Sequence, residues 1–138
     1  MANGAVQTLA VTDDLIGVCT PLAARAICLH EGPTSPRRVI SIAFDDGAIR
    51  TVFDPNPALT PDRFVAARKL QWRAPDGTEL FGYLLTPPDA AAQPPLIVVQ
   101  YRATGFLRGG VGDEYPIQAF ARRGFAVLVL ERPDRRDL

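Results

Sequence analysis

Short apolar runs separated by turn residues fill the first part of the chain. Residues 39–44 and 48–53 flank an Asp-Asp-Gly sequence, whose Asp-Gly pair supplies the positive φ angles of a tight turn. This pattern predicts a β-hairpin. Upstream, residues 15–20 and 25–30 are two more β-like runs, separated by Pro21 and followed by a Gly-Pro pair. The first part of the chain therefore predicts about four strands of one antiparallel sheet.

A proline-rich segment follows this predicted sheet. Three prolines stand within residues 54–61, and proline biases itself and the residue before it away from helix and central strand. We expect a domain boundary there, with residues 1–60 before it and residues 61–138 after it. Beyond it, residues 70–73 and 80–86 bracket a Pro-Asp-Gly sequence that suits a type I turn, which predicts a second hairpin.

The last part of the chain has a different pattern. Residues 96–99 and 125–130 are continuous apolar runs, typical of parallel strands covered on both faces. Between them, helical spacing of apolar residues and a glycine stop predict a helix over residues 114–123. The predicted fold class is therefore α/β, joined to an antiparallel β unit. Because one crossover helix covers only one face of a sheet, we expect exposed strand edges and self-association through them.

Composition and charge narrow the function classes. The 138 residues are 47% hydrophobic and 22% charged, and 15 Lys plus Arg balance 15 Asp plus Glu. A formal charge of zero gives no electrostatic footprint for nucleic acid or an anionic membrane, so neither partner is expected. No apolar stretch reaches the roughly 18 residues of a membrane span. Because the N-terminus also lacks the basic and apolar regions of a secretory signal, the expected location is the cytoplasm.

The sequence shows no pattern for a metal or a cofactor. Cys19 and Cys28 lack the further ligands or the Cys-x-x-Cys spacing of zinc and redox sites, so we expect buried, reduced thiols. A Gly-Val-Gly sequence with Glu131 downstream faintly imitates a dinucleotide-binding fingerprint. Tyr115 occupies the third glycine position of that fingerprint, so no dinucleotide is expected.

Few residues are candidates for catalysis. A serine hydrolase of the α/β type needs Gly-x-Ser-x-Gly, followed by an acid and a histidine. The serines Ser35 and Ser41 and the single histidine, His30, all precede the predicted parallel strands, so no triad can be assembled, and His30 is expected to be structural or solvent-facing. The glycine-rich loop 102–113 lies where open α/β sheets build their sites. Just before it, the phenol of Tyr101 is able to donate a hydrogen bond to an oxyanion, although residue type alone favours a half-buried aromatic.

The sequence between residues 70 and 116 resembles a known family. Residues 70–88, LQWRAPDGTELFGYLLTPP, and residues 95–101, PLIVVQY, resemble the beginning of the hydrolase domain in the prolyl oligopeptidase family of serine peptidases. Residues 100–116, QYRATGFLRGGVGDEYP, look most like the lasso peptide isopeptidases, which hydrolyse the isopeptide bond closing the ring of a threaded lasso peptide. The resemblance covers residues 65–134 well, and residues 15–55 loosely, as the closing strands of a β-propeller.

The resemblance implies a fold and a set of site residues. Residues 1–60 correspond to the end of a β-propeller, and residues 61–138 to the N-terminal part of an α/β-hydrolase domain. Tyr101 matches the tyrosine whose phenol completes the family's oxyanion hole, together with a backbone N–H beside the nucleophile. The loop after it is expected to shape the pocket for a peptide substrate through Arg102, Gly105, Phe106 and Arg108.

The chain also departs from the family pattern. It reaches Leu138 without a Gly-x-Ser-x-Gly sequence, and Glu131 begins a Glu-Arg-Pro-Asp sequence where the family commonly has a glycine-bearing segment. Arg132 is therefore expected to lie in a solvated, charged turn. The leading hypothesis is a catalytically incomplete piece of a longer serine peptidase whose substrate is a lasso peptide. The alternative is a small, non-catalytic peptide-binding or regulatory module that uses loop 102–113 as its contact surface.

Overall fold

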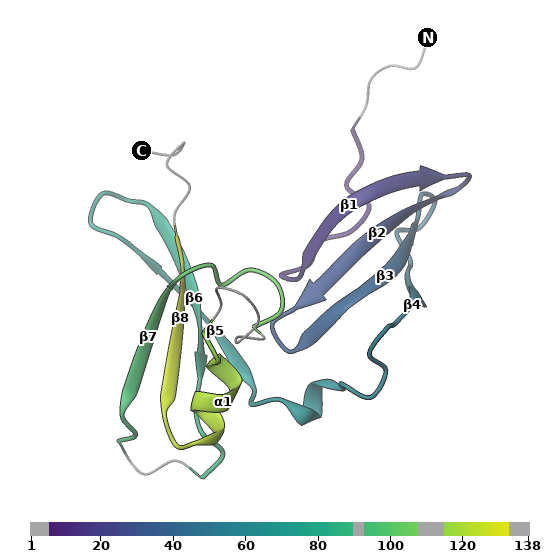
Figure 1. The fold of residues 1–138 in the computed structure, drawn as a ribbon. Coiled ribbons are helices and arrows are strands. Elements are labelled where there is room, and N and C mark those ends of the chain that lie inside the picture. Colours follow the sequence, from purple (N-terminus) through teal and green to yellow (C-terminus); the bar gives the residue numbers. More distant parts are fainter. Residues whose placement is uncertain (1–5, 90–92, 108–114, 133–138) are drawn as a thin grey trace.

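Two four-stranded β-sheets make up the described part of the chain (Figure 1). The computed structural model describes residues 6–89, 93–107 and 115–132. The proline-rich segment lies between the two sheets and contains a short 3-10 helix, η1 (Pro61–Arg63). Within the described ranges, no helix is long and apolar enough to cross a membrane.

The first sheet is an antiparallel meander in the order β1-β2-β3-β4. Its strands are β1 (Leu15–Leu22), β2 (Arg25–Gly32), β3 (Ser35–Ala43) and β4 (Ile49–Phe53). The four expected strands are thus confirmed, and Gly47 has a φ of 69°, as the turn between β3 and β4 requires. Pro21 lies inside β1 instead of separating two strands. The sheet tolerates it because β1 is an edge strand, where a missing N–H costs little.

A disulfide joins Cys19 of β1 to Cys28 of β2, so the expectation of reduced thiols is wrong. Only two residues connect β1 and β2, and next to this turn Thr20 pairs with Ile27. Moving away from the turn, the next residue on each strand is a cysteine, Cys19 on β1 and Cys28 on β2. The irregularity of β1 lies directly beyond these two cysteines, at Val18, which has a φ of 48°. Across a two-residue turn, opposed residues are three, five, seven or nine positions apart, so the separation of nine between Cys19 and Cys28 fits a pair that faces each other across this hairpin. Hairpin geometry was therefore the informative pattern for these cysteines.

The second sheet is mixed and has the order β5-β6-β8-β7. Its strands are β5 (Ala67–Arg73), β6 (Glu79–Leu85), β7 (Leu96–Tyr101) and β8 (Ala126–Glu131). β6 pairs antiparallel with both β5 and β8, whereas β7 and β8 are parallel. The second hairpin and the parallel pair expected from the sequence are both confirmed. Because β8 lies between β6 and β7, the two predicted pieces form one sheet, which the sequence pattern did not indicate.

Helix α1 (Ile117–Arg122) joins β7 to β8 and is shorter than the predicted span of residues 114–123. Pro116 is its N-cap and Arg123 its C-cap, and residue 114 lies outside the described residues. Gly124 follows with a φ of 92°, as expected for a glycine that ends a helix. Pro116 disfavours the helical conformation of the preceding residue, Tyr115, so the helix begins only at Ile117.

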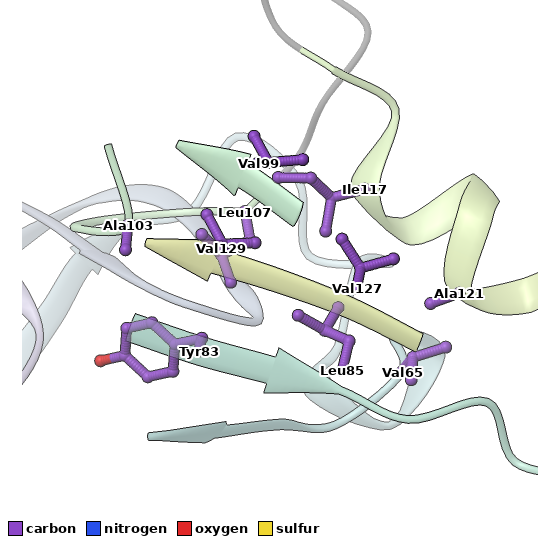
Figure 2. Close-up of a cluster of buried hydrophobic side chains, with 10 residues drawn as sticks. All are labelled: Val65, Tyr83, Leu85, Val99, Ala103, Leu107, Ile117, Ala121, Val127 and Val129. Atoms are coloured by element: carbon purple, nitrogen blue, oxygen red, sulfur yellow. The ribbon is translucent and has the colours of Figure 1, made fainter. Parts of the chain in front are cut away.

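The core lies between α1 and one face of the second sheet (Figure 2). In Figure 2, Ile117 and Ala121 of α1 point toward Val127 on β8. The other face is open in the described residues, since Leu96 and Val98 on β7 are 56% and 54% exposed. The exposed apolar face and edge expected from a single crossover helix are thus confirmed in the described residues, with β7 as the exposed edge strand. The buried cluster consists of Val65, Tyr83, Leu85, Val99, Ala103, Leu107, Ile117, Ala121, Val127 and Val129.

Candidate functional site

The histidine and the serines lie in the first sheet and form no catalytic group. His30 is buried, its Nε2 lies 3.0 Å from Asp14 Oδ2, and its Nδ1 accepts a hydrogen bond of 3.3 Å from Arg38. Because Nδ1 is the acceptor, Nε2 carries the hydrogen of the neutral ring, and this N–H donates the hydrogen bond to Asp14. Ser41 is paired with Ile27, three residue pairs from His30, which is about 10 Å along the strands. The structural role expected for His30 is confirmed.

The backbone of Tyr101 lies at the edge of the second sheet where its parallel strands end. Tyr101 is the last residue of β7 and pairs with Glu131, the last residue of β8. Open α/β sheets place their sites at this carboxyl edge. From here, residues 102–107 leave the second sheet and reach the end of β2, as the green segment after β7 shows in Figure 1. We call residues 102–107 the bridging loop.

Glu131 holds the beginning of the bridging loop. Its Oε2 accepts hydrogen bonds from the backbone N–H of Ala103 at 2.6 Å, from the N–H of Thr104 at 2.8 Å and from the Thr104 hydroxyl at 2.9 Å. A carboxylate that accepts several donors forms stronger hydrogen bonds than a neutral acceptor does. The sequence suggested only a weak dinucleotide fingerprint for Glu131. In the structure this carboxylate instead fixes the loop that follows Tyr101.

Glu31 holds the far end of the bridging loop from the first sheet. This side chain is buried near the end of β2, and its Oε2 accepts the N–H of Phe106 at 3.1 Å. Its other oxygen, Oε1, is paired with the guanidinium of Arg37. One residue further on, the N–H of Leu107 donates to the carbonyl of Pro33 at 3.1 Å. The two sheets are therefore connected through the backbone of this loop.

The residues predicted to shape a peptide pocket differ in how far they are exposed to solvent. Arg102 is exposed. The ring of Phe106 packs edge-to-face on Phe64, with ring centroids 5.2 Å apart, and Gly105 is buried with a φ of 88°. Arg108 lies outside the described residues. Within the described part of this set, Arg102 alone has a side chain open to solvent.

Sequence reasoning did not identify Glu31 and Glu131 as site residues. Glu131 had a usable signal. It directly follows the second apolar run, Tyr101 comes two positions after the first, and parallel strands bring such ends together. Glu31 had none, because 75 positions separate it from Phe106. Among the residues described, no group of three or more His, Cys, Asp or Glu side chains is arranged to hold a metal ion.

An open hollow of about 320 Å³ lies along the hairpin of β5 and β6. The pairing of β6 with β8 stops at Gly82 and Leu130, next to the carboxyl edge where Tyr101 lies. The remaining residues of the hairpin therefore extend past this edge. The hollow is lined by Gln71, Trp72, Arg73, Glu79, Leu80 and Phe81.

The chain resembles solved structures of peptidases of the prolyl oligopeptidase family in fold. The acylaminoacyl peptidase of Pyrococcus horikoshii superposes with a TM-score of 0.71 at 21% identity, over 98% of this chain and 22% of that one. At this identity the likeness shows the fold alone. No family model matches the chain.

The lasso peptide isopeptidase AtxE2 of Asticcacaulis excentricus is more similar. It is 40% identical over 121 residues, which are 86% of this chain and 17% of the relative. A solved structure of an AtxE2 variant with Astexin3 bound matches with a TM-score of 0.80 and 39% identity, over 89% of this chain and 19% of that one. The resemblance to lasso peptide isopeptidases is thus confirmed. The chain spans less than a fifth of the length of these relatives.

Proposed function

We propose that the chain is part of a serine-type peptidase that hydrolyses the isopeptide bond of a lasso peptide. In this proposal residues 1–60 are the end of a β-propeller, and residues 61–138 are the N-terminal part of an α/β-hydrolase domain. The antiparallel meander of the first sheet supports the first assignment. The hairpin beside a parallel pair in the second sheet supports the second assignment, and the 40% identity to AtxE2 supports the substrate class.

The observation that carries the proposal is the place of Tyr101 at the carboxyl edge of the parallel pair. When a serine attacks the isopeptide carbonyl, the carbonyl oxygen becomes an oxyanion. A phenol supplied from this edge stabilises the oxyanion, the amine then leaves, and water releases the acyl group. The sequence contains no Gly-x-Ser-x-Gly to supply the serine. We therefore expect the chain by itself to hydrolyse nothing.

The first test is to sequence the DNA that follows the codon for Leu138 in all three frames. Gly-x-Ser-x-Gly, followed by Asp and His, would supply the groups that the mechanism needs. The encoded protein is then incubated with a threaded lasso peptide, and opening of the ring is followed by mass spectrometry. An intact ring after incubation with a protein that carries all three groups contradicts the proposal.

A tyrosine substitution tests the oxyanion role in that protein. Tyr101→Phe is expected to lower kcat about 10²- to 10³-fold with KM nearly unchanged, because the phenol acts on charge that develops only in the transition state. The control is Tyr115→Phe, at a tyrosine that is 60% exposed, and it should leave the rate unchanged. Equal rates for Tyr101→Phe and the wild type would remove Tyr101 from the mechanism.

A non-catalytic peptide-binding module is the second candidate. It is favoured by the bridging loop, which is held on both sides by residues of this chain. In this case Arg102, exposed on the loop, is the side chain we expect to contact the peptide. Calorimetric titration of the chain with a lasso peptide should then show binding without ring opening, and Arg102→Ala should weaken it.

The disulfide bears on where the protein acts. A disulfide such as Cys19–Cys28 persists mainly in oxidising compartments, which disagrees with the cytoplasmic location expected in the sequence analysis. Alkylation of cell fractions before and after reduction, followed by mass spectrometry, distinguishes the two. Thiols that react without reductant would favour the cytoplasm, and thiols that react only after reduction would favour an oxidising compartment.

A further inference from the structure

We propose that Glu31 and Glu131 are positioning residues that hold the bridging loop behind Tyr101, one from each sheet. The inference rests on the proposed function, because the loop begins directly after the proposed oxyanion residue. Through Glu31, the first sheet would set the geometry of a site built on the second sheet. Neither glutamate touches the reacting atoms in this proposal.

The two carboxylates take up three of the backbone donors of the bridging loop. The N–H groups of Ala103 and Thr104 are bound to Glu131, and the N–H of Phe106 is bound to Glu31. A donor bound to a carboxylate is unavailable to a substrate oxyanion. In this proposal these three N–H groups hold the loop in place, and the oxyanion donor is the phenol of Tyr101.

The contact between Glu31 and the loop is close and specific. Glu31 is 8% exposed, and Arg37 offsets the cost of burying its charge. A Cβ at Gly105 would lie only 2.9 Å from Glu31 Oε2, so the loop approaches the carboxylate as closely as a residue without a side chain allows. Lys69 also pairs with Asp13 between the sheets, but this pair is exposed and contributes little.

Amide hydrogen exchange on the ¹⁵N-labelled 138-residue chain tests the two anchors separately. Glu131→Ala should raise exchange at Ala103 and Thr104 about 10- to 100-fold, as expected when a charge-assisted hydrogen bond is lost. Glu31→Ala should do the same at Phe106. The Gln variants should give smaller increases, because the amide oxygen still accepts a hydrogen bond without the charge. They also keep the test open where an alanine variant fails to fold.

The control is Glu79→Gln, which removes a carboxylate of the second sheet that is paired with Arg73 and exposed. It should leave exchange in the bridging loop unchanged. Unchanged exchange at Ala103, Thr104 and Phe106 in the Glu31 and Glu131 variants would overturn the proposal. A uniform rise across both sheets would also overturn it, because the glutamates would then stabilise only the fold.

Kinetics in the protein that carries the serine motif connect the anchors to catalysis. Glu31→Gln should lower kcat about tenfold while KM changes little, because a misplaced Tyr101 weakens binding of the transition state. A higher KM at unchanged kcat would overturn the positioning role. If the wild-type protein does not open lasso peptides, the proposed function fails, whereas the exchange experiment still decides whether the two glutamates hold the loop.

Discussion

Replacement of Gly105 by alanine separates backbone strain from side-chain contact, because the chain contains a matched control. Gly105 and Gly77 have φ angles of 88° and 92°, so alanine at either position costs about 1–2 kcal/mol of backbone strain. The surroundings differ. At Gly105 the added Cβ would lie 2.9 Å from Glu31 Oε2 and 3.3 Å from Leu15 Cδ2, whereas at Gly77 nothing lies within 4 Å.

The additional loss at Gly105 follows from the group that must move. The Glu31 carboxylate has to shift, which breaks its 3.1 Å hydrogen bond to the N–H of Phe106, worth about 1.5–3 kcal/mol for a charged acceptor. We therefore expect Gly77→Ala to lower the free energy of unfolding by about 1.5 kcal/mol, and Gly105→Ala to lower it by about 3–4.5 kcal/mol.

Urea unfolding followed by circular dichroism measures both losses, and a double-mutant cycle assigns the difference. In a Glu31→Ala background the additional loss at Gly105 should disappear, because the group that the Cβ displaces is gone. Equal losses for Gly77→Ala and Gly105→Ala in the unmodified background would refute the contact. An additional loss that persists without Glu31 would assign it to Leu15 instead.

Three further predictions concern stability and association. Reduction of Cys19–Cys28, or Cys19→Ser, should lower the free energy of unfolding by about 2.5 kcal/mol from loop entropy, and equal urea midpoints with and without reductant would contradict this. Burial raises the pKa of the Tyr83 phenol above its ordinary 10.0, although Lys69 opposes the shift. The folded state thus holds this proton more tightly than the unfolded state, so stability should fall as the pH rises above about 10, and less so in Tyr83→Phe when urea midpoints are compared. Val98 is 54% exposed on the edge strand β7, so Val98→Lys should reduce self-association, and light scattering that shows a monomeric wild type would remove the basis for this prediction.

Part of the candidate site was accessible from the sequence. Tyr101 lies two positions after the continuous apolar run 96–99, so its place at the carboxyl end of a parallel strand followed from a local pattern. The role of Gly105 was predictable only in part. A glycine suggests a positive φ, but the sequence does not show that the Glu31 carboxylate lies next to it. Glu31 was inaccessible, since its hydrogen bond to Phe106 joins residues from two sheets.

The sequence by itself determined the strands and turns. Gly47 and Gly77 adopt positive φ in turns, and apolar runs become strands, because these preferences depend on neighbouring residues alone. Tertiary structure alone decided that β8 lies between β6 and β7, that α1 covers one face, and that two glutamates hold the bridging loop. These features depend on which distant surfaces gain most from mutual burial and on which buried N–H groups then need acceptors. Such gains have no signature in the residues next to each other along the chain.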